Sequence, residues 1–203
     1  MPTDGLARRR ELFHARNQEY LREGLDRRAS ARFVARAAGT LRGPALDVGT
    51  GKGLLAIELA RQALDVVSQD VDAEEQALAA LLAEEAGVAR RIRFVRGDAA
   101  RVACSDGHFG CAAMMDVLHH LQDPEPVLRE MGRCVGPGGV VVLADFTPEG
   151  FEIVARVHRA SGREHPVSGA TIAMGREMLR GMGLVPVLET RAQHHELLVV
   201  EKG

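Results

Sequence analysis

Three alternate glycines follow a short apolar run near residue 50, and they mark the first candidate binding site. The run spans residues 45–48, the glycines are Gly49, Gly51 and Gly53, and an apolar, helix-forming segment begins directly afterwards at Leu54. Glycine carries no side chain, so the backbone can bend sharply there and come within contact distance of a bound molecule. We therefore expect a flat, polar ligand at this turn.

Acidic residues accompany four predicted strands at or near their carboxyl ends: Asp47, Asp70, Asp98 and Asp116. Ligands of open parallel sheets bind at this edge. A carboxylate about twenty residues beyond the glycine turn accepts hydrogen bonds from ribose hydroxyls, and Asp70 holds that position. The acids and the turn together indicate a ligand that contains a nucleoside.

The spacing of the glycines separates two nucleoside cofactors. The dinucleotide pattern GxGxxG requires glycine at position 54, which is leucine here. A nicotinamide oxidoreductase is therefore a remote alternative. An ordinary tight turn without a ligand is the structural alternative for any single glycine pattern.

The elements that must position these residues follow a regular order. Residues 6–40 have helical spacing with a break at Gly24, which predicts a cap of two helices. From residue 44 the pattern alternates between strand and helix, which predicts a parallel sheet covered on both faces. The last two strands are separated by residues 190–194 and are expected to form an antiparallel hairpin. The predicted strands are 45–48, 65–69, 92–95, 109–115, 140–144, 185–189 and 195–200, and the predicted helices of this part are 54–62, 73–85, 124–134, 149–161 and 172–182.

Several motifs in this order resemble the class I S-adenosylmethionine-dependent methyltransferases, especially their small-molecule branch. The resemblance covers about residues 44–146. It implies a Rossmann-like three-layer α/β sandwich with a seven-stranded, mostly parallel sheet and an antiparallel last strand. We divide the chain into a helical cap or lid, residues 1–43, and a cofactor-binding domain, residues 44–203. The motifs are Leu46-Asp47-Val48-Gly49-Thr50-Gly51-Lys52-Gly53, Gln69-Asp70-Val71-Asp72, Phe94-Val95-Arg96-Gly97-Asp98-Ala99, Asp116-Val117-Leu118-His119-His120-Leu121-Gln122-Asp123-Pro124, and Leu128-Arg129-Glu130-Met131 before Pro137-Gly138-Gly139.

The resemblance also implies a set of cofactor contacts, with S-adenosylmethionine as the donor and S-adenosylhomocysteine as the product. The turn would face the methionine portion, the second strand end would hold the ribose and adenine, and the third and fourth strand ends would reach the adenine and the sulfonium. Tyr20 of the cap touches the cofactor carboxylate or the acceptor, unless it only packs. The implied residues are Asp47, Gly49, Thr50 and Gly51 for the methionine portion, Asp70 for the ribose, Val71, Asp98 and Ala99 for the adenine, and Met115 and Asp116 for the sulfonium and amino end.

Methyl transfer from a sulfonium releases a neutral thioether, so a base is needed only when the acceptor is protonated at working pH. His119 and His120 follow the fourth strand and are the candidate bases, although they can equally form the turn into the next helix. The spacing of His158, His165, His194 and His195 matches no short metal motif, so we predict no metal site. Lys52, inside the turn, is expected to point its ammonium to solvent.

Composition limits the remaining choices. The 203 residues carry a formal charge of −2, with ten arginines among residues 1–42, and only three cysteines, which form no CxxC pair. With no leader and no apolar span, we expect a cytoplasmic enzyme without membrane contact. The motif of base-amine methyltransferases is missing after Asp116, so a nucleic-acid partner is not expected and a small-molecule acceptor is favoured. The alternatives are an RNA or protein methyltransferase and a non-catalytic regulatory protein that binds S-adenosylmethionine.

Overall fold

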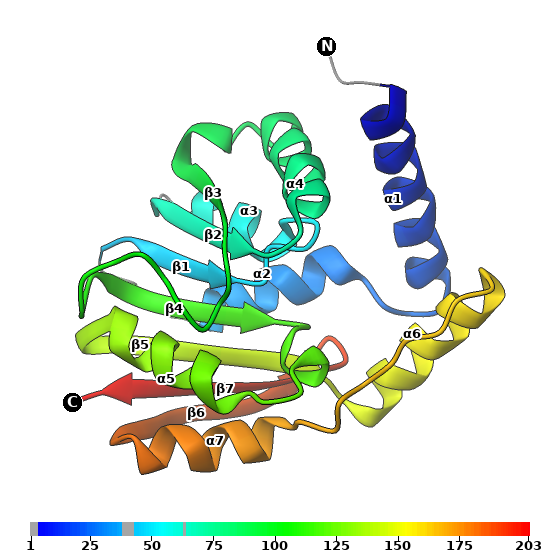
Figure 1. Ribbon diagram of the computed structural model, residues 1–203. Helices are drawn as coiled ribbons and strands as arrows, with labels where there is room; N and C mark the ends of the chain where they lie inside the picture. The colour runs from blue at the N-terminus through cyan, green and yellow to red at the C-terminus, as the bar shows by residue number, and fades with distance from the viewer. Residues whose placement is uncertain (1–3, 38–42, 63) are drawn as a thin grey trace.

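One seven-stranded sheet forms the centre of the computed structural model, which describes residues 4–37, 43–62 and 64–203 (Figure 1). The strand order is β3-β2-β1-β4-β5-β7-β6. Only β7 is antiparallel to its neighbours, β5 and β6, so the predicted fold class is confirmed. The strands are β1 (Ala45–Val48), β2 (Val66–Asp70), β3 (Ile92–Arg96), β4 (Phe109–Met115), β5 (Val135–Phe146), β6 (Leu184–Ala192) and β7 (His195–Lys202).

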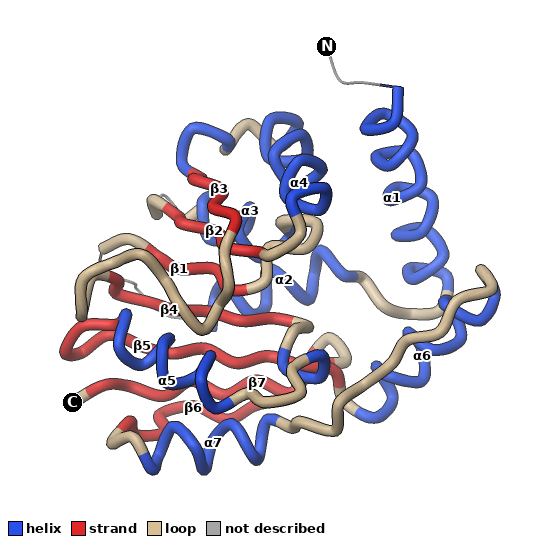
Figure 2. The backbone as a smooth tube through the Cα atoms, viewed as in Figure 1, coloured by secondary structure: helices blue, strands red, loops and turns tan. Residues whose placement is uncertain are grey.

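Helices cover both faces of this sheet and give three layers (Figure 2). Alternation along β4 shows how the two faces are built: Cys111 and Ala113 pack in one apolar cluster, whereas Ala112 and Met114 pack in the other. Both faces are apolar, as expected for a parallel sheet that is buried on both sides. The first face is covered by α2 (Arg27–Ala37), α3 (Leu54–Arg61) and α4 (Ala73–Glu85), and the second by α5 (Glu125–Cys134) and α7 (Ile172–Gly181).

Two further helices lie beyond the carboxyl ends of the parallel strands. They are α1 (Asp4–Arg22) and α6 (Pro148–Ala160), drawn dark blue and yellow in Figure 1 on the side to which β4 points. Tyr20 and Leu25 pack there against Phe146, Ile153 and Val154 in a small separate cluster. The two N-terminal helices and the break at Gly24, where φ is +92°, are as predicted.

The proposed boundary between residues 43 and 44 adjoins residues 38–42, which lie outside the described part of the chain. Helix α2 is not separate from the sheet, because Val34 and Ala35 belong to the same apolar cluster as α3 and β1. Within the described ranges, no helix combines the length and apolar character that crossing a membrane requires.

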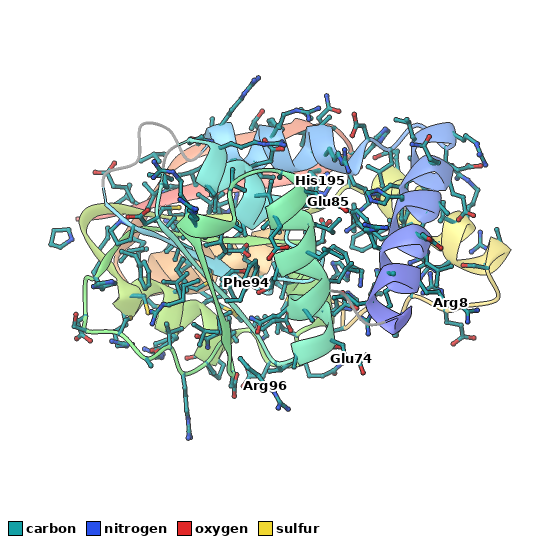
Figure 3. The ribbon with its side chains drawn as sticks, turned by 90° about the horizontal axis from the view of Figure 1, so that it is seen from above. Arg8, Glu74, Glu85, Phe94, Arg96 and His195 are labelled. Carbon is teal, nitrogen blue, oxygen red and sulfur yellow. The ribbon has the colours of Figure 1, made fainter. Side chains whose placement is uncertain are left out.

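Arginines of α1 pair with acids of α4. Arg9 contacts Glu74 and Glu75, and an Nη1 atom of Arg10 lies 3.2 Å from Glu85 Oε1. Figure 3 labels Glu74 and Glu85 at the two ends of α4. Part of the N-terminal arginine excess therefore attaches α1 to the sheet domain rather than facing water alone.

Five strands differ from the predicted bounds: β2 by one residue at each end, β3 by one residue at its carboxyl end, and β5, β6 and β7 by more. Strand β5 starts at Val135 instead of residue 140, since Val135 already pairs with Phe109 across an irregularity in the β4–β5 register. Gly136 permits this approach, because a Cβ there would lie 2.9 Å from the Gly107 carbonyl oxygen. The predicted hairpin exists, but its turn is only Gln193 and His194, at φ +53° and +60°, which is the two-residue turn that suits strand twist.

Candidate functional site

The glycine turn has the backbone that its sequence predicts. Gly49, Gly51 and Gly53 have φ of +81°, +47° and +74°, in the region that favours glycine. A Cβ at Gly49 would overlap the side chain of Val117, and one at Gly53 would lie 2.9 Å from the Ala79 Cβ. No heavy atom lies within 4 Å of a Cβ built on Gly51, so that position is open.

A buried polar network supports the turn from below. Ser68 Oγ donates to Asp47 Oδ2 at 2.6 Å and lies 2.7 Å from Thr50 Oγ1, and Gln76 Nε2 donates to the Ser68 carbonyl oxygen at 3.2 Å. Burial raises the pKa of Asp47 to about 7, although the Ser68 hydrogen bond opposes that shift. The Asp47 carboxyl thus contacts the turn's own network, and its contribution to an ammonium site stays a prediction.

A cavity of about 470 Å³ opens above the turn, within the usual size range of small-molecule sites. It brings together residues that are far apart in the sequence, from the ends of β1, β2 and β4 and from the loop after β3. Of the residues predicted for the site, those that line it are Gly49, Thr50, Gly51, Asp70, Val71, Asp98, Ala99, Met115, Asp116 and His120.

Hydrogen bonds fix the acids of this cavity in place. Asp70 Oδ2 accepts from the Gly51 amide at 2.8 Å, and its Oδ1 accepts from the Asp72 amide at 2.9 Å. The Asp98 side chain accepts from the Ala100 amide at 2.9 Å. Each carboxylate is therefore held by backbone donors at the cavity edge, with oxygen lone pairs left for a ligand.

Lys52 differs from its expected position. Its ammonium pairs with Glu75 of α4, and its side chain is 26% exposed, so the charge is matched by a carboxylate instead of extending into solvent. Asp72 is the N-cap of α4, as its place before residues 73–75 predicts, and accepts from the Glu74 and Glu75 amides.

A second cavity of about 370 Å³ adjoins the first, and Arg27, Gly51, Lys52, Asp116 and His120 line both. Its other walls come from α1, α6, the loop after α6, and the short 3₁₀ turn η2 (Leu118–His120). Those segments include the cap and the region after β5. Two further residues predicted for the site, Tyr20 and His119, line this cavity. Residues not predicted for the site also line it, among them Arg16, Asn17, Phe146, His158, Arg163 and His165.

Three histidines meet in the wall of this second cavity. His119 is 2% exposed, its Nδ1 donates to Asp145 Oδ1 at 2.6 Å, and its Nε2 lies 3.0 Å from His165 Nε2. The His120 ring lies beside both at steep interplanar angles, with ring centroids 4.0 Å from His119 and 5.0 Å from His165. Burial and the neighbouring histidines lower the pKa of His165 to about 4, and burial and His119 lower that of His120. We call His119, His120 and His165 the histidine cluster.

Sequence reasoning did not find this grouping, because it compared His165 with His158, His194 and His195 instead of the η2 histidines. It also missed Asp145, whose two oxygens accept from the His119 ring and amide. Asp145 lies near the carboxyl end of the buried strand β5. An acid at a strand end is the signal that identified the other four acids, and it also indicates Asp145.

Asp116 and His195 form a buried ion pair beside the cluster. His195 Nε2 lies 2.7 Å from Asp116 Oδ1, Arg27 Nη2 lies 3.7 Å from Asp116 Oδ2, and Asp116 has φ +59°. Burial disfavours the charged form of both groups, but the attraction and hydrogen bond between them outweigh this effect. The pKa of His195 is therefore raised and that of Asp116 is lowered. A non-glycine residue in the left-handed region stores strain that its surroundings must hold.

This pair predicts a pH dependence of stability. A raised His195 pKa stabilises the fold below the ordinary value of 6.5, and that contribution disappears as pH rises through the folded-state value. The lowered Asp116 pKa stabilises it above 3.8, and that contribution is lost as pH falls. We expect His195→Gln to cost about 2 kcal/mol of unfolding free energy at pH 6 and less at pH 9.

Urea unfolding at pH 6, 7, 8 and 9 measures this dependence. Asp47 also titrates in this range. The quantity compared is therefore the slope of unfolding free energy against pH, in the wild type and in the variant. His108→Gln, at an exposed histidine, is the matched control and keeps the wild-type slope. Equal slopes in the wild type and His195→Gln would contradict the assigned charge on His195.

Comparisons with known proteins agree with this geometry. Residues 46–143 match the family model of a methyltransferase domain. A ubiquinone biosynthesis O-methyltransferase of Pectobacterium carotovorum is 36% identical over 110 residues, which are 54% of this chain and 45% of that protein. The corresponding protein of Escherichia coli K12 is 32% identical over 120 residues and is covered to 49%, so the chain spans about half the length of these curated relatives.

Solved structures share the fold at low sequence identity. One is a protein of Methanococcus maripaludis that is assigned as an S-adenosylmethionine-dependent methyltransferase without a demonstrated activity. It superposes with a TM-score of 0.71 and 16% sequence identity, and the match covers 98% of this chain and 92% of the other chain. Another is geranyl diphosphate C-methyltransferase of Streptomyces coelicolor, which was solved with Mg²⁺, geranyl diphosphate and S-adenosylhomocysteine. It superposes with a TM-score of 0.68 and 13% sequence identity, and the match covers 86% of this chain and 80% of the other chain.

Proposed function

We propose that this chain, whose residues 46–143 match the family model of a methyltransferase domain, transfers a methyl group from S-adenosylmethionine to a small-molecule acceptor. The observation that carries the proposal is the first cavity, where the glycine turn, Asp70 and Asp98 converge at the carboxyl edge of the sheet. Backbone donors, a ribose-binding carboxylate and a third acid are the groups that an adenosyl ligand requires. The family match and the O-methyltransferase relatives support the same donor.

Within this proposal each wall of the first cavity holds one part of the cofactor. The open backbone at Gly51 admits the methionine portion, and the fixed Asp70 carboxylate accepts from the ribose hydroxyls. Val71, which is 63% exposed at the cavity edge, covers the adenine, and Asp98 accepts from its amino group. Met115 and Asp116 then lie at the sulfonium end, where the two cavities join.

The second cavity holds the acceptor, and its charge indicates a small molecule with an anionic or hydrogen-bond-accepting group. Arg16, Arg27 and Arg163 line it, and burial together with Arg163 lowers the pKa of Arg16. Within the described residues, the Arg16 Nε and both amide atoms of Asn17 are buried without a hydrogen-bond partner. Such groups are costly unless a ligand satisfies them. We propose that residues 1–43 act as the cap that supplies them.

Catalysis in this arrangement depends chiefly on position. The methyl–sulfur bond breaks as the bond to the acceptor forms in line with it, and its electron pair stays on sulfur, so the donor leaves as a neutral thioether. His120 lines both cavities and is the proposed base for a protonated acceptor, while Asp145 fixes the ring of His119 beside it. An O-methyltransferase is the finer assignment that the curated relatives favour.

A methyltransferase that acts on RNA or protein, and a regulatory protein that only binds the cofactor, are the alternatives. The ion pairs of Arg9 and Arg10 with α4 reduce the positive charge that is free to attract RNA. A cytoplasmic location remains a prediction from the low cysteine content.

Ligand binding and turnover test the proposal together. We expect S-adenosylhomocysteine and S-adenosylmethionine to raise the unfolding temperature, by about 2.7 kcal/mol of stabilisation at one hundred times the dissociation constant, and NAD to have no effect. Labelled S-adenosylmethionine should then transfer its methyl group to members of a panel of small hydroxylated acids. Absence of stabilisation by both adenosyl compounds would refute the donor assignment. Binding without transfer to small molecules, RNA or protein would favour the regulatory alternative.

A further inference from the structure

We propose that the histidine cluster is a binding site for a divalent transition-metal ion, with His119, His120 and His165 as ligands. One nitrogen from each of the three rings lies within 4.8 Å of the others. Three imidazoles are the ligand set of open zinc sites, and imidazole also suits iron, cobalt, nickel and copper. The inference differs from the sequence-based expectation of no metal site, which rested on spacing along the chain.

The hydrogen bond to Asp145 turns a lone pair of His119 toward His165. His119 Nδ1 donates to Asp145, so in the neutral ring the Nε2 atom that faces His165 is an acceptor. A metal-bound histidine usually has this second contact to a carboxylate or a backbone carbonyl, because the contact fixes its tautomer and orientation.

The distances are compatible with a metal ion in place of the direct hydrogen bond between His119 and His165. Two nitrogens that bind one tetrahedral ion at about 2.0–2.1 Å lie roughly 3.3 Å apart. His119 Nε2 and His165 Nε2 are 3.0 Å apart, so a shift of a few tenths of an ångström admits the ion between them. His120 must move further, and its side chain lines both cavities, where it has room to turn.

Nearby charges make a cation acceptable despite the arginines of the second cavity. Asp145 contacts His119 directly, and Asp116 interacts electrostatically with His119 and His165. His158 stays outside the ligand set, because its Nε2 lies 3.0 Å from Tyr20 Oη. Three protein ligands leave one position open toward the second cavity.

That open position gives the site a substrate class, and this step rests on the proposed function. An acceptor with a hydroxyl next to an anionic group would place the hydroxyl oxygen on the ion and the anionic group on the arginines. With the ion bound, the ion and not His120 would activate the acceptor, because a His120 nitrogen that binds the ion cannot accept a proton. The ion would orient the oxygen at the junction of the two cavities, beside Asp116. The preferred acceptors are therefore small molecules that chelate metals through oxygen.

Cobalt binding tests the site without any methyl acceptor. The tag-free full chain is freed of metal with a chelator and titrated with Co²⁺, whose visible absorption reports imidazole ligands and low coordination number. We expect binding of one ion, weakened at least about 100-fold in His165→Ala, which removes a ligand from a loop, and about 10–100-fold in Asp145→Asn, which acts through His119. His108→Ala, at an exposed histidine outside the cluster, is the matched control and keeps the wild-type affinity.

Unchanged affinity in both His165→Ala and His120→Ala, or a spectrum of octahedral hydrated Co²⁺ in the wild type, would overturn the proposal. S-adenosylhomocysteine binding is measured on the same samples. It should persist in His165→Ala, which shows that a lost cobalt signal comes from the cluster and not from unfolding. If the wild type did not bind S-adenosylhomocysteine, the proposed function would be contradicted. The cobalt titration would still decide the metal site separately.

Discussion

Asp70→Ala is expected to weaken S-adenosylhomocysteine binding by at least about 100-fold while the protein stays folded. The carboxylate has two functions in the proposed site: it accepts from the ribose hydroxyls and, through Oδ2, from the Gly51 amide at 2.8 Å. Charge-assisted hydrogen bonds of this kind are about twice as strong as neutral ones, so their loss amounts to roughly 3 kcal/mol. Calorimetric titration of the wild type and the variant measures the difference.

Two variants make this result specific. Asp70→Asn keeps an oxygen for the Gly51 amide but loses the charge, so we expect an intermediate loss of about 10-fold. Asp72→Ala, two residues away on the same loop, removes the N-cap of α4 and costs about 1 kcal/mol of stability without changing affinity. If Asp70→Ala bound S-adenosylhomocysteine as tightly as Asp72→Ala does, the ribose assignment would be wrong.

Gly49→Ala is expected to lower the free energy of unfolding by at least about 3 kcal/mol. Two costs add: φ of +81° is unfavourable for alanine, and the new Cβ overlaps the Val117 side chain. The overlap is not cheap to relieve, because Val117 connects β4 to η2 and contacts the second apolar cluster. Denaturant unfolding of the variant measures the loss.

Gly51→Ala is the matched variant, since it has the same change in the same turn at a position with open space around it. It should cost only about 1 kcal/mol of stability, and it should still weaken cofactor binding because its methyl group enters the cavity. Adding Val117→Ala to Gly49→Ala should recover part of the lost stability. Equal free energies of unfolding for Gly49→Ala and Gly51→Ala would show that the contact between the new Cβ at position 49 and Val117 does not destabilise the protein.

Local sequence patterns predicted that the residues lining the first cavity would lie together, because each of its walls is a short segment at the end of a strand. The turn at Gly49 and the acids Asp70 and Asp98 each depend on a few neighbouring residues and on a known strand order. The strand bounds were least accurate at β5, where pairing with Phe109 extends the strand through glycines that, by themselves, indicate a loop.

The histidine cluster was beyond such reasoning for a physical reason. His119 and His165 are 46 residues apart, and they meet only because α6 and its following loop return across the edge of the sheet. No periodicity encodes that return. The thiols of Cys104 and Cys134, 30 residues apart and with Sγ atoms 3.2 Å from each other, are a second contact that spacing did not reveal.

The two cavities draw their walls from different parts of the chain, and this division affects how such a protein can change over time. The first is built mainly from residues 49–127, whereas most side chains that line only the second come from α1, α6 and the loop that follows. Replacement of those outer segments alters the shape and charge of one compartment and leaves the Asp70 and Asp98 anchors untouched. If the two cavities hold donor and acceptor as proposed, exchange of α1 and α6 between relatives is a route to new acceptor specificity with an unchanged donor site.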